Sequence, residues 1–121
     1  MKVSDKSKQF ITIIYLFIVS VLFLLPGSAF PQNDWLSGFY FDKWVHAGIF
    51  LLMAFLFIWT YHLFSTSQLL ILLLLLAAYG FIVEVIQDQF VKNRSMDMKD
   101  WVADVAGSLL GIWLARRYIK K

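Results

Sequence analysis

The chain has 121 residues, of which 60% are hydrophobic and only 16% are charged, and its mean hydropathy is +0.71. A water-soluble domain carries about a quarter charged residues, and one of this length cannot bury so much apolar surface. The composition therefore excludes an ordinary soluble domain. The absence of cysteine excludes disulfides, thiolate metal sites and thiol nucleophiles. The net charge of +3 is modest and gives no indication of nucleic-acid binding.

Four apolar runs follow one another along the chain, and each predicts a transmembrane helix. Each is close to the roughly 20 residues that cross a hydrocarbon core of about 30 Å, and only helices or closed barrels satisfy the backbone in lipid. The sequence thus predicts an all-α fold, a single domain over 1–121 that forms a four-helix transmembrane bundle. We also expect a short helix lying in the membrane interface near 30–41. The expected membrane-spanning helices cover about 10–27, 43–64, 69–89 and 99–118.

The distribution of basic residues predicts the orientation in the membrane. An even number of crossings places both ends of the chain on one side, with seven basic residues there and four on the other. Cytoplasmic flanks carry the excess of Lys and Arg, so we expect both termini in the cytoplasm. The two sets are Lys2, Lys6, Lys8, Arg116, Arg117, Lys120 and Lys121, against Lys43, Lys92, Arg94 and Lys99.

The start of the chain has a second interpretation. A basic beginning, an apolar run and the small residues at 27–29 also resemble a cleavable signal peptide. Its removal would leave three helices in the same orientation.

Titratable residues recur at one depth on three of the expected helices. His46 lies one turn inside Asp42, and Asp104 lies one turn inside Asp100. On the third helix Glu84 lies one turn, about 6 Å, inside its neighbouring acid. Intramembrane ionisable groups normally face a bundle interior or a wet cavity. The sequence therefore predicts an outward-facing polar pocket, with Asp42, Lys43, His46, Glu84, Gln87, Arg94, Asp97, Asp100 and Asp104 as its binding residues.

Small residues accompany these groups at helical spacing. Gly107 and Gly111 form a pair four residues apart that would let the last helix approach a neighbour closely, and Gly80 would do the same for the third. A simpler alternative is that the polar residues only pair with one another and hold the helices in register.

The motifs in order resemble the VanZ-like family of bacterial membrane proteins, over about residues 28–111. Asp104 departs from that pattern, because the family often has Asn there. The resemblance implies a cell-envelope location, as a multi-pass protein of the bacterial cytoplasmic (inner) membrane. It also implies a link to resistance against the glycopeptide teicoplanin, but no agreed reaction. The motifs are Asp42-Lys43-x-x-His46, Gly80-x-x-x-Glu84-x-x-Gln87, Arg94 with Asp97, and Asp100-x-x-x-Asp104-x-x-Gly107-x-x-x-Gly111.

Three functions are compatible with such a pocket. The first is binding, without catalytic residues, metal or cofactor, of a lipid-linked cell-wall precursor, a lipid head group or a lipophilic glycopeptide. The second is a membrane-embedded enzyme in which His46, Glu84, Asp100 and Asp104 bind a divalent metal or act as general acid and base. The third is a small transporter working as a dimer. We expect membrane lipids, and no nucleic acid, among the partners.

Overall fold

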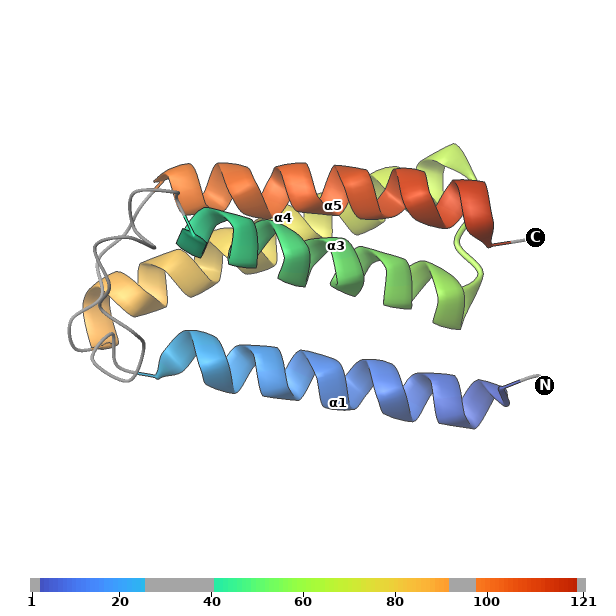
Figure 1. Ribbon diagram of the computed structural model, residues 1–121, viewed down its shortest axis with the longest axis horizontal. Coiled ribbons are helices and arrows are strands. Elements are labelled where there is room, and N and C mark those ends of the chain that lie inside the picture. The colour runs from blue at the N-terminus through green and yellow to red at the C-terminus, as the bar shows by residue number, and fades with distance from the viewer. Residues whose placement is uncertain (1–2, 26–40, 92–97, 120–121) are drawn as a thin grey trace.

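The computed structural model describes residues 3–25, 41–91 and 98–119. These contain four helices that run alternately in opposite directions in one bundle, so that the two chain ends lie together (Figure 1). We call this end of the bundle the terminal end and the other the polar end. The all-α architecture is thereby confirmed, while the helix expected near 30–41 lies almost entirely outside the described residues. The helices are α1 Asp5–Leu24, α3 Phe41–Tyr61, α4 Thr66–Phe90 and α5 Met98–Tyr118.

The first helix begins five residues earlier than expected and ends earlier too. Its start is set by Ser4, whose hydroxyl accepts a hydrogen bond from the Ser7 amide at 3.2 Å, and Asp5 adds a negative charge in the first turn. Its end is set by the residue before Pro26, since a residue that precedes proline is disfavoured in the helical conformation. Leu25 accordingly adopts an extended conformation.

The turn between α3 and α4 also replaces the expected boundaries at 64 and 69. His62 has a φ of 55°, in the left-handed region that terminates helices. Ser65 and Gln68 then form a capping box, in which each side chain binds the other's backbone amide. The helix α4 therefore begins at Thr66.

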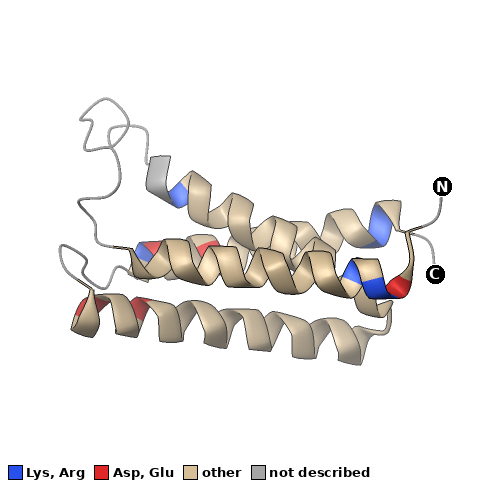
Figure 2. Ribbon diagram, turned by 90° about the horizontal axis from the view of Figure 1, so that it is seen from below, with Lys and Arg blue, Asp and Glu red and all other residues tan. Residues whose placement is uncertain are grey.

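Three of the four described helices, α1, α3 and α4, are long and apolar enough to cross a membrane. Among the described residues, Lys, Arg, Asp and Glu gather toward the two ends of the bundle and leave the middle without charged residues (Figure 2). The middle also exposes many large hydrophobic side chains, including Phe17, Leu74 and Leu75. Such an extended apolar exterior fits a hydrocarbon environment and would be unfavourable in water.

The helices α3 and α5 form the most extensive contact in the bundle. A Cβ atom added at Gly107 would collide with the backbone of Ala47, and one added at Gly111 would collide with the carbonyl oxygen of Leu51. The glycines thus allow the two backbones to touch, the kind of contact that replaces the hydrophobic effect between helices in lipid.

The first helix is attached to the others by polar contacts along its length. The hydroxyls of Thr12 and Thr60 lie 2.6 Å apart, and Tyr15 donates to the carbonyl oxygen of Ile49 at 2.7 Å. At the polar end, the Gln87 amide donates to the carbonyl oxygen of Phe23 at 2.8 Å. These bonds define which face of α1 meets the bundle.

Candidate functional site

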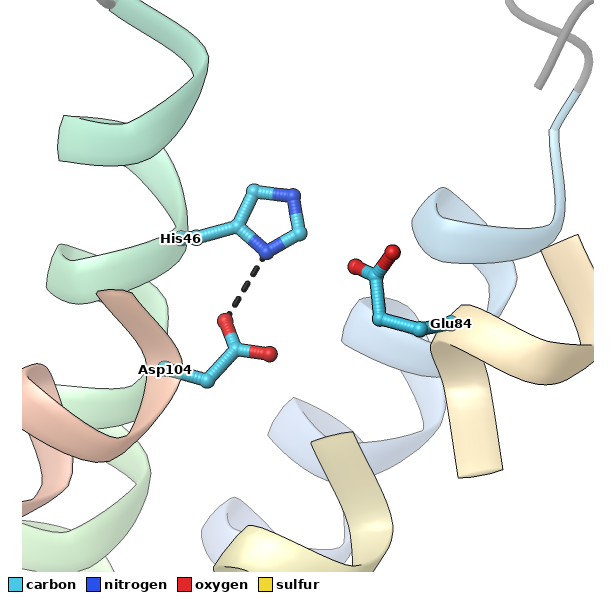
Figure 3. A group of neighbouring side chains, drawn as sticks. All are labelled: His46, Glu84 and Asp104. Atoms are coloured by element: carbon cyan, nitrogen blue, oxygen red, sulfur yellow. Dashed lines mark hydrogen bonds and ion pairs between the residues drawn. The ribbon is translucent and has the colours of Figure 1, made fainter. Parts of the chain in front are cut away.

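Three titratable side chains from three helices meet inside the polar end. His46 comes from α3, Glu84 from α4 and Asp104 from α5, and all three point toward one another (Figure 3). Their exposed fractions are 6%, 0% and 2%. One nitrogen or oxygen atom from each can be chosen so that the three atoms lie within 4.8 Å of one another. We call these three residues the polar cluster.

A chain of polar contacts connects the polar cluster to the end of the bundle. His46 Nδ1 and Asp104 Oδ1 are hydrogen-bonded at 2.8 Å, while Nε2 of the same ring lies 3.8 Å from Asp100 Oδ2. Asp100 in turn forms an ion pair with Lys43, with 2.9 Å between Oδ1 and Nζ. Both members of this pair are partly exposed, so this series of polar contacts leads from the buried imidazole to the surface.

Asp104 and its partner His46 are positioned by neighbours from several helices. Gly80 provides room for the Asp104 carboxylate, because an added Cβ there would lie 2.8 Å from Oδ2. The Ser108 hydroxyl donates to its backbone carbonyl at 2.8 Å. On the far side of the imidazole, the ring of Phe23 stacks on His46 with 5.2 Å between centroids. All four helices therefore contribute to holding the polar cluster.

The charges at this site are unequal among the described residues. Glu84, Asp100 and Asp104 contribute three carboxyl groups, against the ammonium of Lys43 and an imidazole. Charges removed from water are costly unless they are paired or coordinated. The arrangement therefore favours protons, cations, ammonium groups or hydroxyls, and disfavours direct contact with a bare anion.

The structure brings together five of the nine binding residues expected from the sequence. Gln87 is buried at the same end, but its amide binds the backbone of α1, as described above. Asp42 lies in the first turn of α3, and its side chain is outside the described part of the structure, as are Arg94 and Asp97. The five residues that meet are Lys43, His46, Glu84, Asp100 and Asp104.

Two neighbours of the polar cluster were not expected from the sequence. Phe23 gives no signal, since it is one apolar residue among many in α1. Ser108 was detectable in principle, because it follows Asp104 by four residues and so lies on the same face of α5.

Comparison with known proteins places the chain in no group. No family model matches it, and neither a curated protein nor a solved structure matches it. The similarity to the VanZ-like family therefore stays a prediction that depends on the motifs.

Proposed function

We propose that this chain is a four-span protein of the bacterial inner membrane, similar to the VanZ-like family, which binds the polar head of a membrane-embedded envelope ligand at its outer end. The observation that carries the proposal is the polar cluster itself, three buried titratable groups from three helices of an otherwise apolar bundle. Intramembrane ionisable residues are costly and usually mark functional sites.

The exposure pattern of α5 supports a fourth crossing. This helix is less apolar than the others, yet every one of its buried residues is polar or small: Asp104, Gly107, Ser108, Gly111 and Ala115. Its exposed face carries Val102, Leu109, Leu110 and Trp113. A helix with this arrangement presents hydrocarbon to its surroundings and polar groups to its neighbours, as expected in lipid.

The charges at the two ends support the orientation. Among the described residues, the terminal end carries four basic residues and one acidic residue, and the polar end carries two basic and four acidic residues. An excess of Lys and Arg favours the cytoplasmic side, so the termini are assigned to the cytoplasm and the polar cluster to the outer leaflet. The two sets are Lys6, Lys8, Arg116, Arg117 and Asp5, and Lys43, Lys99, Glu84, Asp88, Asp100 and Asp104.

This topology is tested by labelling single cysteines, because the natural chain has none. Gln89→Cys places a thiol at the polar end, and Tyr118→Cys places one at the terminal end, both at exposed positions. In intact cells, a membrane-impermeant maleimide should label the first and not the second, which should react only after permeabilisation. The reverse pattern would overturn the orientation, and equal labelling of both in intact cells would overturn the even number of crossings.

The excess of carboxyl groups indicates the chemistry of the ligand. A head group with an ammonium group or sugar hydroxyls complements Glu84 and Asp104, while Lys43 at the edge would meet a phosphate. Lipid head groups and lipid-linked cell-wall precursors both have this combination, whereas a lipophilic glycopeptide offers the amines and sugar hydroxyls without the phosphate.

Binding is tested on the purified protein with defined probes. Short-chain phosphatidylethanolamine, short-chain phosphatidylglycerol and a polyprenyl diphosphate-linked sugar are titrated in neutral detergent, and complexes are counted by native mass spectrometry. Probes with an ammonium or sugar group should bind tightest, and Glu84→Gln should weaken them by about tenfold. The control His62→Asn removes the other imidazole at the terminal end and keeps a residue that tolerates a positive φ. Affinities that ignore the head group, or that survive Glu84→Gln, would contradict the proposal.

A resistance phenotype gives an independent test of the family resemblance. The chain and its Glu84→Gln variant are produced at equal abundance in a teicoplanin-sensitive bacterium, and susceptibility is measured. We expect the natural chain to lower susceptibility and the variant to lose that effect.

A second function, a membrane-embedded enzyme, is favoured by one specific observation. The hydrogen bond from His46 to Asp104 resembles the orientation of a general base by a carboxylate, and leaves Nε2 for proton transfer. Hydrolysis of the polyprenyl diphosphate-linked sugar by the natural chain, and its loss in His46→Gln, would establish this function. Unchanged substrate after prolonged incubation at high protein concentration would exclude it for that probe.

A further inference from the structure

We propose that His46, Glu84 and Asp104 form a binding site for one divalent transition-metal ion. This inference goes beyond head-group binding and does not depend on it, because an ion can be measured on the protein without any lipid ligand. The sequence analysis placed no metal in the binding protein and considered a divalent metal only for the alternative of a membrane-embedded enzyme.

The distances among the three residues suit a single ion. Bonds from Zn²⁺ to imidazole nitrogen and carboxylate oxygen are about 2.0–2.2 Å, so two ligand atoms on one ion lie about 3 to 4.4 Å apart. The His46 and Asp104 ligand atoms that are hydrogen-bonded lie 2.8 Å apart, and one atom from Glu84 can be added with every separation within 4.8 Å. Small side-chain rotations would therefore place all three within bonding distance of one centre.

The three ligands come from three helices that are held independently. The close contact between α3 and α5 places His46 beside Asp104, and Gly80 on α4 leaves room for the Asp104 carboxylate one turn from Glu84. A site assembled from rigid helices retains its geometry better than one built on loops. The cluster is thus prearranged for a ligand that contacts all three residues at once.

Polar and apolar neighbours complete the surroundings that metal sites usually have. Asp100 Oδ2 lies 3.8 Å from His46 Nε2, close enough to orient the ring after a small movement, and Lys43 anchors that carboxylate. Groups of this kind fix ligand orientation and increase ligand basicity. On the other side, the ring of Phe23 stacks on the imidazole and packs against Phe50 with 6.2 Å between centroids, so the buried imidazole has apolar neighbours there.

Charge and ligand type identify the class of ion. Two carboxylates carry a charge of about −2 when ionised, which a divalent cation balances in a buried site where separate charges are costly. One nitrogen and two oxygens suit Zn²⁺ or Mn²⁺, whereas Mg²⁺ and Ca²⁺ prefer oxygen ligands alone. Three protein ligands leave a coordination position for water or for an oxygen of a bound molecule, so the ion would give the acidic site an affinity for phosphate.

The experiment measures ions on the full-length chain purified in neutral detergent. The protein is stripped with a chelator, dialysed against Zn²⁺, Mn²⁺ or Mg²⁺, and analysed for metal content and for affinity by calorimetry. We expect about one Zn²⁺ per chain, weaker Mn²⁺ and little Mg²⁺. Each of His46→Ala, Glu84→Gln and Asp104→Asn should weaken Zn²⁺ by at least tenfold, whereas His62→Asn should not.

Glu84→Gln is the decisive variant, because glutamine keeps the size of glutamate and can accept hydrogen bonds in its place. Circular dichroism and gel filtration establish that each variant is folded before its affinity is compared. Zn²⁺ binding by the folded Glu84→Gln variant equal to that of the natural chain, or no binding by the natural chain, would overturn the proposal. Repeating the lipid titrations with and without chelator keeps the two proposals distinct, since ion binding can persist when head-group binding fails.

Discussion

Replacing Gly107 by alanine tests whether the contact between α3 and α5 holds the bundle together. The added Cβ would collide with the carbonyl oxygen of Ala47 and lie 2.7 Å from its Cα, where ordinary contact begins at 3.4 Å, so the helices must separate by at least about 0.7 Å. The obstacle is backbone, which no side-chain rotation removes. Overpacking costs about 1–3 kcal/mol, and separation also stretches the buried bond between His46 and Asp104, whose loss costs about 1–3 kcal/mol. We expect the free energy of unfolding to fall by about 2–6 kcal/mol.

The free energy of unfolding is measured in neutral detergent by titration with a denaturing detergent, followed through the fluorescence of the five tryptophans. Gly48→Ala is the matched control, since it lies in α3, the helix that Gly107 of α5 contacts, and an added Cβ there meets nothing within 4 Å. Alanine is the better helix former by about 1 kcal/mol, so the control should be neutral or slightly stabilising. A Gly107→Ala variant as stable as the natural chain would refute the close approach of the two backbones.

Three further changes probe other contacts. Gly111→Ala should also lower the free energy of unfolding, because its Cβ would meet the backbone of α3; stability equal to that of Gly48→Ala would contradict this. Thr12→Val or Thr60→Val should cost about 0.6–1.7 kcal/mol, and the double variant should cost less than the two combined, since the hydroxyls bond each other at 2.6 Å. A double-mutant cycle with no coupling would argue against that bond. Gly80→Ala should weaken Zn²⁺ by about tenfold by displacing the carboxylate of Asp104, and calorimetry showing natural affinity would count against the assigned ligand.

Hydropathy alone was enough to predict four helices, because apolar runs of this length have few other structures available in lipid. It placed their ends less well. Because residues such as Lys6 are charged, the predicted start of α1 came late, at about residue 10. The N-cap formed by Ser4 instead lets the helix begin at Asp5 and run through these charged residues. At the C-terminal end of α3, the apolar run of the sequence continues past Tyr61, but the left-handed backbone conformation of His62 ends the helix. Caps and backbone conformation act over one or two residues, and a hydropathy averaged over about twenty residues cannot detect them.

The spacing of acids along three helices predicted that His46, Glu84 and Asp104 share one level, because depth follows from counting turns. Their actual contact depends on how each helix is rotated about its axis, which turn counting leaves undetermined. In the structure, that rotation for α5 is set by Gly107 and Gly111, which must face α3. Gln87 illustrates this limit of counting turns. It lies at the expected depth, but its side-chain amide donates to the carbonyl oxygen of Phe23 in α1 instead of joining the polar cluster.

The close contact of Gly107 and Gly111 with α3 and the polar cluster are two parts of one arrangement. Between helices in lipid there is no hydrophobic force, so in the proposed four-span bundle α5 is held by close packing and by hydrogen bonds. Asp104 can be buried only if α3 and α4 shield it from hydrocarbon, and the glycines bring α3 near enough to do so. Conversely, the bond from His46 to Asp104 lies one turn from Gly107 and adds attraction where the backbones already touch. A ligand that bridges the three residues would therefore join three helices at the point where α5 is least apolar. The proposed function at the polar end and the stability of the bundle would then depend on the same few residues.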